Sequence, residues 1–125
     1  MIIIVFKMLA RMLGYSNEVF NYMYCQSMLE TGNFTSEIYR ENKNCFGMKK
    51  PQLRPNLVIG ENRGHAIYSS KLDSWLDLFI RHNYFGISTA AKRDVNKYAQ
   101  FLIVSNYAED TEYVDKINTL YQNYC

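Results

Sequence analysis

The sequence predicts an α+β domain that is mostly helical and carries one small β-hairpin. Three observations lead to this expectation. Apolar residues recur at helical spacing along most of the chain, and serines and glycines stand where such helices would begin and end. Only one stretch, residues 57–68, has the pattern of a strand pair. Runs of helix around a single strand pair are typical of an α+β architecture.

The N-terminal part of the chain predicts three helical segments. An amphipathic first helix is expected to end at Gly14, because glycine commonly follows the last turn of a helix. Ser16 is placed to cap a second helix, which we expect to end at Gly32. A short helical turn capped by Thr35 is then expected over residues 37–40.

The middle of the chain predicts the hairpin. Two prolines at positions 51 and 55 interrupt the helical pattern. The apolar runs 57–59 and 66–68 then flank the turn-forming sequence G-E-N-R-G at residues 60–64.

The C-terminal part returns to helical spacing. Apolar residues from position 72 to position 80 form one stripe, and we expect this helix to start at Ser69 or Ser70 and to stop at Gly86. A further helix is expected over residues 94–104. The last should span residues 111–124, with Asp110 as its N-cap.

Size and composition narrow the class of protein. A chain of 125 residues predicts a single domain over residues 1–125. Its 48% hydrophobic and 21% charged residues are ordinary for a globular protein and argue against disorder. The net charge of +2 is compatible with an anionic wall polymer but too small to indicate nucleic-acid binding.

The apolar N-terminal residues do not have the pattern of an export signal, and the cysteines do not have the spacing of a metal site. Lys7 and Arg11 interrupt the start and no small-residue cleavage site follows, so we expect no signal peptide and no membrane insertion. The three cysteines and two histidines lack metal-ligand spacing, so no metal or cofactor is expected. Three cysteines cannot all pair in one molecule, so no disulfide framework is implied. Counting alone does not decide against a catalytic Cys–His pair, because such partners need only meet in space.

Glu30 is the first candidate for chemistry. It stands four residues after Gln26 and seven after Met23, on the inward stripe of the second expected helix. Burial and the negative end of the helix dipole would both raise the pKa of its carboxyl group. Glycosidases use such a protonated carboxyl as the acid for the leaving oxygen. From position alone, a helix-end glutamate turned toward water is the preferred interpretation.

A resemblance to a known family favours the catalytic interpretation. Residues 28–36 (M-L-E-T-G-N-F-T-S) and 42–49 (N-K-N-C-F-G-M-K) resemble the signature of glycoside hydrolase family 73, an L-E-[ST]-G element before an N-x-F-G-[IM]-K element. Residues 63–69 (R-G-H-A-I-Y-S) are similar to the strand that closes the family's small lobe. Residues 105–110 (S-N-Y-A-E-D) resemble its Y-A-x-D element. The four elements keep the family's order within residues 16–125.

The resemblance implies a lysozyme-like fold and a peptidoglycan β-N-acetylglucosaminidase, as in the family's bacterial and bacteriophage members. By position, Glu30 is similar to the general acid and Tyr107 to the active-site tyrosine. The implied substrate-binding positions are Asn44, Phe46, Gly47 and Tyr68. If the motifs are set aside, Tyr107 and Phe46 are also compatible with a role in core packing alone. Lys43 and Cys45 depart from the family's usual Asn and Leu, which places substrate affinity in question rather than the fold.

The second carboxylate is a choice between two mechanisms. Glu61 is the one acid between Lys49 and Tyr68, within the expected lobe. As the base of an inverting enzyme it would activate a water molecule, with the two carboxyl groups about 6.5–9.5 Å apart. If the acetamido group of the substrate assists instead, Glu61 is a solvated turn residue of lesser importance.

These observations predict an enzyme that cleaves the β-1,4 bond after N-acetylglucosamine in peptidoglycan. The chain shows no signal peptide and no wall-binding module, which is compatible with a bacteriophage lysis or virion-associated enzyme acting on the cell wall. It would reside in the host cytoplasm before release or on the particle. The alternatives are a lytic transglycosylase, an enzyme for N-acetylglucosamine links in glycoproteins, and an inactive glycan-binding or virion structural protein with the same fold.

Overall fold

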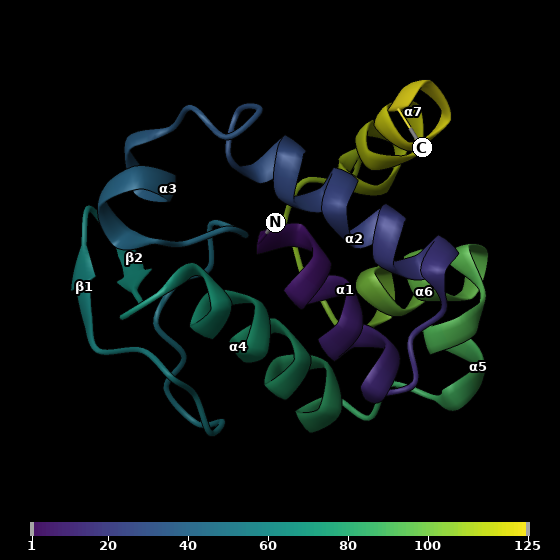
Figure 1. The fold of residues 1–125 in the computed structure, drawn as a ribbon, viewed down its shortest axis with the longest axis horizontal. Helices are drawn as coiled ribbons and strands as arrows, with labels where there is room; N and C mark the ends of the chain where they lie inside the picture. Colours follow the sequence, from purple (N-terminus) through teal and green to yellow (C-terminus); the bar gives the residue numbers. More distant parts are fainter. Residues whose placement is uncertain (1, 125) are drawn as a thin grey trace. The chain divides into compact units, whose positions relative to one another are not determined.

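The computed structural model describes residues 2–124, so Met1 and Cys125 lie outside the described residues. The elements are α1 (Ile2–Met12), α2 (Asn17–Glu30), α3 (Glu37–Asn42), β1 (Gly60–Asn62), β2 (His65–Ile67), α4 (Lys71–Tyr84), α5 (Thr89–Arg93), α6 (Val95–Val104) and α7 (Tyr113–Tyr124) (Figure 1). The described residues are mostly helical and contain one two-stranded antiparallel sheet, which confirms the predicted α+β, lysozyme-like class.

The chain forms two compact units. The hairpin unit comprises Ser27–Gly86, and the helical unit comprises Met1–Gln26 with Ile87–Cys125. The predicted organisation as one domain over residues 1–125 stays a prediction. No helix among residues 2–124 has both the length and the apolar character needed to cross a membrane.

Local signals set the ends of α1 and α2 as predicted. Gly14 follows α1 with a φ of 95°, and the Tyr15 N–H donates to the Ala10 carbonyl over 3.0 Å. A left-handed residue closed by this six-residue bond is the usual glycine stop of a helix. The Ser16 hydroxyl accepts the Val19 N–H at 3.1 Å and so caps α2.

One helix start differs from the prediction, and at another the structure decides between the two predicted caps. The cap of α3 is Ser36 and not Thr35, because the Ser36 hydroxyl accepts the Tyr39 N–H at 3.1 Å. The Thr35 hydroxyl instead donates to the Gly32 carbonyl at 2.7 Å, which closes the preceding turn. At α4, Ser70 is the cap of the two serines considered, and it accepts the Asp73 N–H at 3.1 Å.

The hairpin forms where predicted, but its first strand lies three residues later than expected. Arg63 and Gly64 both have positive φ, 56° and 76°, which is the signature of a two-residue type I′ turn. This turn fixes the register and pairs Glu61 with Ala66. Residues 57–59 were expected to be a strand. The Leu57 N–H instead donates to the Asp77 carboxylate at 3.1 Å, which holds the chain outside the sheet at Leu57, whereas the Ile59 N–H still donates to the Ile67 carbonyl of β2 at 2.9 Å.

The helical unit also departs from the expected C-terminal pattern. The short helix α5 was not predicted. Asp94, where the next helix was expected to begin, is the N-cap of α6, and its carboxylate accepts the Lys97 N–H at 3.2 Å. The last helix begins at Tyr113, two residues later than expected. Asp110 lies before this start. Its carboxylate accepts the Glu112 N–H at 2.9 Å and pairs with Lys116 at 2.6 Å.

A buried ion pair joins three parts of the hairpin unit. The two carboxylate oxygens of Asp77 accept from the Arg54 guanidinium at 2.9 and 2.8 Å. The Tyr68 hydroxyl donates to the same carboxylate at 2.6 Å. Asp77 is fully buried, so these donors replace the water that its charge would otherwise need. The pair therefore fixes the proline-containing loop and the end of the hairpin against α4.

His82 makes the stability of the fold sensitive to pH. It is fully buried, and burial followed by the neighbouring charges of Arg81 and Arg54 lowers its pKa well below 6.5. As the pH falls through about 6.5, His82 therefore binds a proton in the unfolded chain but stays neutral in the folded chain. Stability should be constant above pH 7 and should fall below pH 6.5 by up to about 1.4 kcal/mol per pH unit.

Thermal unfolding between pH 5.5 and 7.5 tests this expectation. His82→Gln should flatten the melting-temperature profile over that range, whereas His65→Gln on the hairpin serves as the matched control and should leave the slope in place. Equal slopes for the wild type and His82→Gln would show that another group is responsible.

Candidate active site

Glu30 is the last residue of α2 and is half-buried. The next residue, Thr31, is almost fully buried and holds the helix end together. Its hydroxyl donates to the Ser27 carbonyl at 2.8 Å and accepts the Phe34 N–H at 2.9 Å. A hydroxyl is required for both bonds, which gives a physical reason for the Ser or Thr in the L-E-[ST]-G element. The residue after Glu30 thus fixes the backbone that carries the carboxyl group.

The turn after Thr31 is left-handed over three successive residues. Gly32, Asn33 and Phe34 have φ values of 55°, 60° and 66°. Glycine adopts this conformation freely, whereas a bulky side chain such as phenylalanine does so at a cost. The Asn33 N–H donates to the Met28 carbonyl at 2.8 Å, so the helix end remains hydrogen-bonded as the chain reverses. The chain therefore leaves the Glu30 position abruptly and continues to α3.

Gly47 lies directly against the Glu30 carboxyl group. A Cβ atom at position 47 would stand 2.8 Å from Glu30 Oε2, closer than a carbon and a non-bonded oxygen can approach. Gly47 also has a φ of 63°, which favours glycine for a second reason. The glycine of the N-x-F-G-M-K element and the glutamate of the L-E-T-G element therefore meet in the fold. This contact brings together two motifs that are separate in the sequence.

The loop that carries Gly47 is held by the buried amide of Asn44. Its Nδ2 donates to the carbonyls of Met48 at 2.9 Å and of Ala66 at 3.0 Å. Its Oδ1 accepts the N–H groups of Phe46 at 3.3 Å and of Met48 at 3.1 Å. Both donors and both acceptor positions of this amide are in use. Asn44 therefore ties the loop to itself and to β2.

Two serines of the hairpin unit, one from the end of α2 and one from α4, hold the same loop at Cys45. The Ser27 hydroxyl of α2 donates to the Cys45 carbonyl at 2.6 Å, and the Cys45 N–H donates to the Ser74 hydroxyl of α4 at 2.8 Å. The Phe46 ring then packs edge-on against Trp75, with ring centroids 4.7 Å apart. The Glu30 helix end and the Gly47 loop are thus connected by one direct hydrogen bond, from Ser27 to Cys45.

Asn42 is a positioning residue to which the sequence pattern assigned no role. Its Nδ2 lies within hydrogen-bond distance of the carbonyls of Asn62 and His65, at 3.1 and 3.3 Å, and its Oδ1 accepts from the Asn62 amide at 2.9 Å. It is 1% exposed and anchors the hairpin turn to the end of α3. The one feature of the sequence that could have indicated this role is the position of Asn42, two residues before Asn44.

The predicted substrate-binding positions divide into two kinds. Asn44, Phe46 and Tyr68 are 0%, 1% and 1% exposed, and their described contacts are with other protein groups. Gly47 is half-buried beside the Glu30 carboxyl group. The first three therefore build the loop and the hairpin, and Gly47 is the member of the set that touches the candidate acid.

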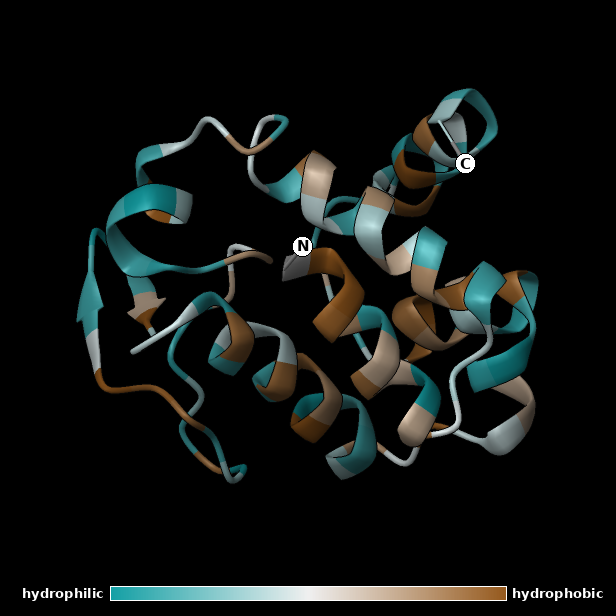
Figure 2. Cartoon of the chain, viewed as in Figure 1, coloured by the Kyte–Doolittle hydropathy of each residue, from teal (hydrophilic) through white to brown (hydrophobic). Residues whose placement is uncertain are grey.

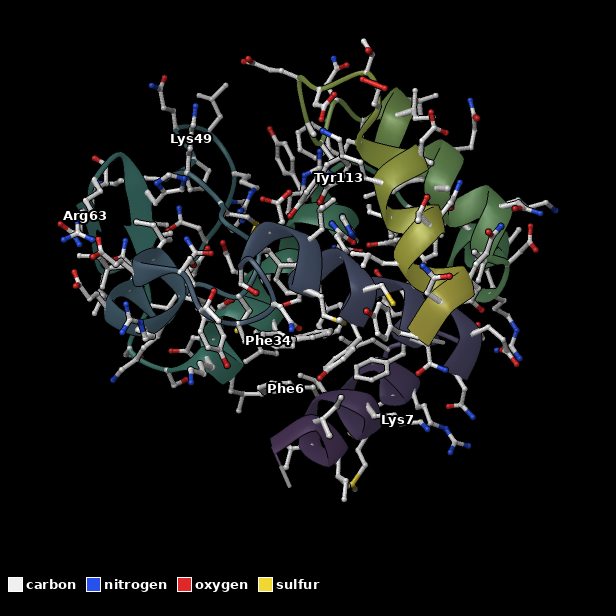
Figure 3. The ribbon with its side chains drawn as sticks, turned by 90° about the horizontal axis from the view of Figure 1, so that it is seen from above. Phe6, Lys7, Phe34, Lys49, Arg63 and Tyr113 are labelled. Atoms are coloured by element: carbon white, nitrogen blue, oxygen red, sulfur yellow. The ribbon has the colours of Figure 1, made fainter. Side chains whose placement is uncertain are left out.

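Glu61 is an exposed residue in the middle of β1 rather than in the turn. The turn itself carries Arg63, labelled in Figure 3, which forms ion pairs with Glu37 and Glu41 of α3. These pairs fasten the hairpin tip to α3, which lies beside it in Figure 1. Glu61 thus projects from a strand that is anchored at both its turn and its partner strand.

Tyr107 belongs to the helical unit and follows the end of α6. Asn106 adopts the left-handed conformation with a φ of 53°, and the Tyr107 N–H donates to the Leu102 carbonyl at 3.0 Å. This is the same stop motif that ends α1. The half-buried Tyr107 ring packs against Tyr113, with centroids 5.7 Å apart.

The buried cysteines are poorly suited to nucleophilic chemistry. Cys25 and Cys45 are 0% and 2% exposed, and burial raises the pKa of the Cys45 thiol to about 11. A thiol with that pKa is almost entirely protonated near neutral pH, whereas the thiolate is the nucleophile. Cys125 lies outside the described residues. Among residues 2–124, no three His, Cys, Asp or Glu side chains gather as a metal site.

A family model described as glucosaminidase, mannosyl-glycoprotein endo-β-N-acetylglucosaminidase, matches residues 9–125. The chain belongs to the glucosaminidase family. Membership makes it a glycoside hydrolase with endo-β-N-acetylglucosaminidase activity, and it supports peptidoglycan glycan strands as the substrate class. Comparisons with curated proteins and with solved structures gave no match. In this glucosaminidase the matched residues include Glu30, Gly47, Glu61 and Tyr107.

Proposed function

We propose that this glucosaminidase hydrolyses the β-1,4 bond after N-acetylglucosamine in peptidoglycan, with Glu30 as the general acid. One observation carries the proposal, namely the contact of Gly47 with the Glu30 carboxyl group. A helix-end glutamate turned into water would not require a glycine behind it. The family membership supplies the reaction class, and the fixed helix end and loop supply the rigid support that a catalytic carboxyl group needs.

In the proposed reaction, Glu30 gives its proton to the oxygen of the leaving sugar as the bond from that oxygen to the anomeric carbon breaks. Water forms the new bond to the anomeric carbon and loses a proton to a base. The net change is the addition of one water across one glycosidic bond. Because Gly47 lies against the Glu30 carboxyl group, that group loses little conformational freedom when the transition state forms, which favours catalysis.

Mass spectrometry of the fragments released from purified peptidoglycan tests the function. Hydrolysis should leave reducing N-acetylglucosamine ends. Anhydro-muramic ends would instead identify a lytic transglycosylase, and binding without release would identify an inactive glycan-binding protein. A high-mannose glycoprotein should be included as a second substrate, because release of its glycan would identify an enzyme that cleaves N-acetylglucosamine links in glycoproteins.

We further propose a bacteriophage lysis or virion-associated role, with the protein acting on the cell wall. The proposal rests on the cell-wall substrate class that the family match supports. The organisation as one domain over residues 1–125 is part of the proposal, since the family match runs through both units. Expression inside a bacterium, with and without a separate membrane-permeabilising protein, tests the lysis role. Lysis only with the permeabilising protein is expected.

Tyr107→Phe tests the proposed active-site tyrosine. The change removes one hydroxyl and keeps the ring that packs on Tyr113. If the hydroxyl interacts with the reacting groups, turnover should fall roughly tenfold or more, with a loss of stability below about 1.5 kcal/mol. Tyr113→Phe is the matched control and should retain activity. A destabilised Tyr107→Phe enzyme whose folded fraction works normally would make Tyr107 a packing residue.

Glu61→Gln decides between the two mechanisms for the second step. If Glu61 activates the water, the variant should lose nearly all turnover, and azide should restore part of it by replacing the nucleophile. If the acetamido group of the substrate assists, the variant should be mildly affected and a thiazoline analogue of N-acetylglucosamine should inhibit strongly. Glu18→Gln, an exposed acid in the first turn of α2, is the control. We favour Glu61 as the base, and full activity of Glu61→Gln would overturn that choice.

A further inference from the structure

The helix α1 exposes an apolar face that the proposed hydrolase chemistry does not use. Its members are large side chains between 48% and 80% exposed, namely Ile4, Val5, Met8 and Met12. The opposite side of the helix is buried, with Phe6 at 7% and Ala10 at 0% exposure. We call the first set the exposed face of α1. In Figure 2 the N-terminal half of α1 is strongly hydrophobic.

Spacing makes this face a continuous strip. Ile4, Met8 and Met12 are four residues apart, so they lie in one row along the helix. Lys7 and Arg11 form the neighbouring row, and α1 contains no acidic residue. Lys7 is labelled on α1 in Figure 3. The outward side of α1 therefore combines an apolar strip with a basic edge.

A third cation stands at the C-terminal end of the same helix. The Lys92 ammonium donates to the Leu13 carbonyl at 3.0 Å and lies 5.4 Å from the centroid of the Tyr15 ring. Both contacts are within the helical unit. The positive charge beside α1 thus extends from the middle of the helix to its C-terminal end, which favours a partner with negative charge spread over a surface.

Most of this face lies before the residues that the family model matches, and Met12 lies within them. The match begins at residue 9, so Ile4, Val5, Lys7 and Met8 precede it. None of these residues takes part in the contacts that hold Glu30 or Gly47. The face is therefore a feature that the hydrolytic reaction does not explain.

We propose that the exposed face of α1 binds the surface of an anionic phospholipid bilayer. An 11-residue helix is about 16 Å long, roughly half the hydrocarbon thickness of a bilayer, so α1 would lie in the plane of the interface. The apolar strip enters the boundary between headgroups and acyl chains, and Lys7, Arg11 and Lys92 face the phosphate groups. Such a division of apolar and basic sides is typical of interfacial helices.

Co-sedimentation with vesicles tests the proposal. The 125-residue protein should bind vesicles that contain phosphatidylglycerol, should bind far less to phosphatidylcholine alone, and should be released at high salt. Equal binding to both lipids, or no binding to either, would overturn the proposal.

Paired substitutions separate the contributions of the two rows. Met8→Gln with Met12→Gln should weaken binding at least about tenfold, because two apolar side chains no longer enter the interface. Lys7→Gln with Arg11→Gln should weaken it about fivefold per charge on anionic vesicles only. The matched control is Ile103→Gln with Val104→Gln, two exposed apolar residues at the end of α6, which should bind as the wild type does.

Two further measurements keep the outcomes distinct. Circular dichroism must show that each variant is folded, and hydrolysis of solubilised wall fragments should be unchanged in all of them, because the face is separate from the catalytic residues. Failure of lipid binding therefore leaves the proposed hydrolysis intact, and the reverse also holds. A dimer in sedimentation velocity that Met8→Gln with Met12→Gln converts to monomer would assign the face to a second copy of the chain and overturn the lipid proposal.

Discussion

Glu30→Gln is expected to lower the turnover of peptidoglycan at least about a hundredfold while leaving the fold intact. The amide has nearly the same shape as the carboxyl group and so fits beside Gly47, but it has no acidic proton for the leaving oxygen. Binding of the glycan should change much less than turnover, since the proton is needed in the transition state and not for association. Release of reducing ends, measured at saturating and at low substrate, gives both quantities.

The matched control for this variant is Glu18→Gln, an exposed glutamate in the first turn of the same helix. It removes one negative charge from α2 and should cost only the small helix-dipole contribution of about 0.3–1 kcal/mol. Near-normal wall lysis by a folded Glu30→Gln protein would refute the proposed mechanism.

Gly47→Ala is expected to lower turnover about a hundredfold by displacing the Glu30 carboxyl group. The new methyl group would meet Glu30 Oε2 at 2.8 Å, and the end of a flexible side chain yields more easily than the backbone. A misplacement of this order is enough to cost about a hundredfold in rate. The positive φ adds about 1–2 kcal/mol of strain, so the melting temperature should fall slightly.

Gly86→Ala separates these two effects. Gly86 has a φ of 76°, and no described atom lies within 4 Å of its added Cβ. It should therefore show the strain without the loss of rate. A second test places Gly47→Ala in the Glu30→Gln background, where it should have little further effect on turnover if Gly47 acts through Glu30. Multiplicative losses would show that Gly47 acts through another group.

Helix ends were predictable from the sequence because they depend on nearby residues. Gly14 and Gly32 can adopt positive φ, and the hydroxyl of Ser16 reaches an N–H three residues away. The errors were also local. Ser36 competes with Thr35 for the same cap, and neither residue type is preferred strongly enough to decide between them.

The strand boundary was less predictable because its cause lies elsewhere in the chain. Residues 57–59 have the composition of a strand, and their pattern gave no reason to exclude them. The Asp77 carboxylate, twenty residues later, takes the Leu57 N–H that a sheet would have used. The turn was predicted within residues 60–64, but its exact position at Arg63 and Gly64 was not, since a left-handed arginine is uncommon and is held here by its pairs with Glu37 and Glu41.

The motifs around Glu30 and Gly47 were readable in the chain, and so was the α+β class, since both rest on residue order and on spacing within a helix or a turn. The approach of Gly47 to the Glu30 carboxyl group was not readable, nor was the interior position of Asn44. Both arise where segments distant in sequence pack together and buried polar groups must find partners there. Backbone preferences act over a few residues, whereas such contacts depend on the path of the whole chain.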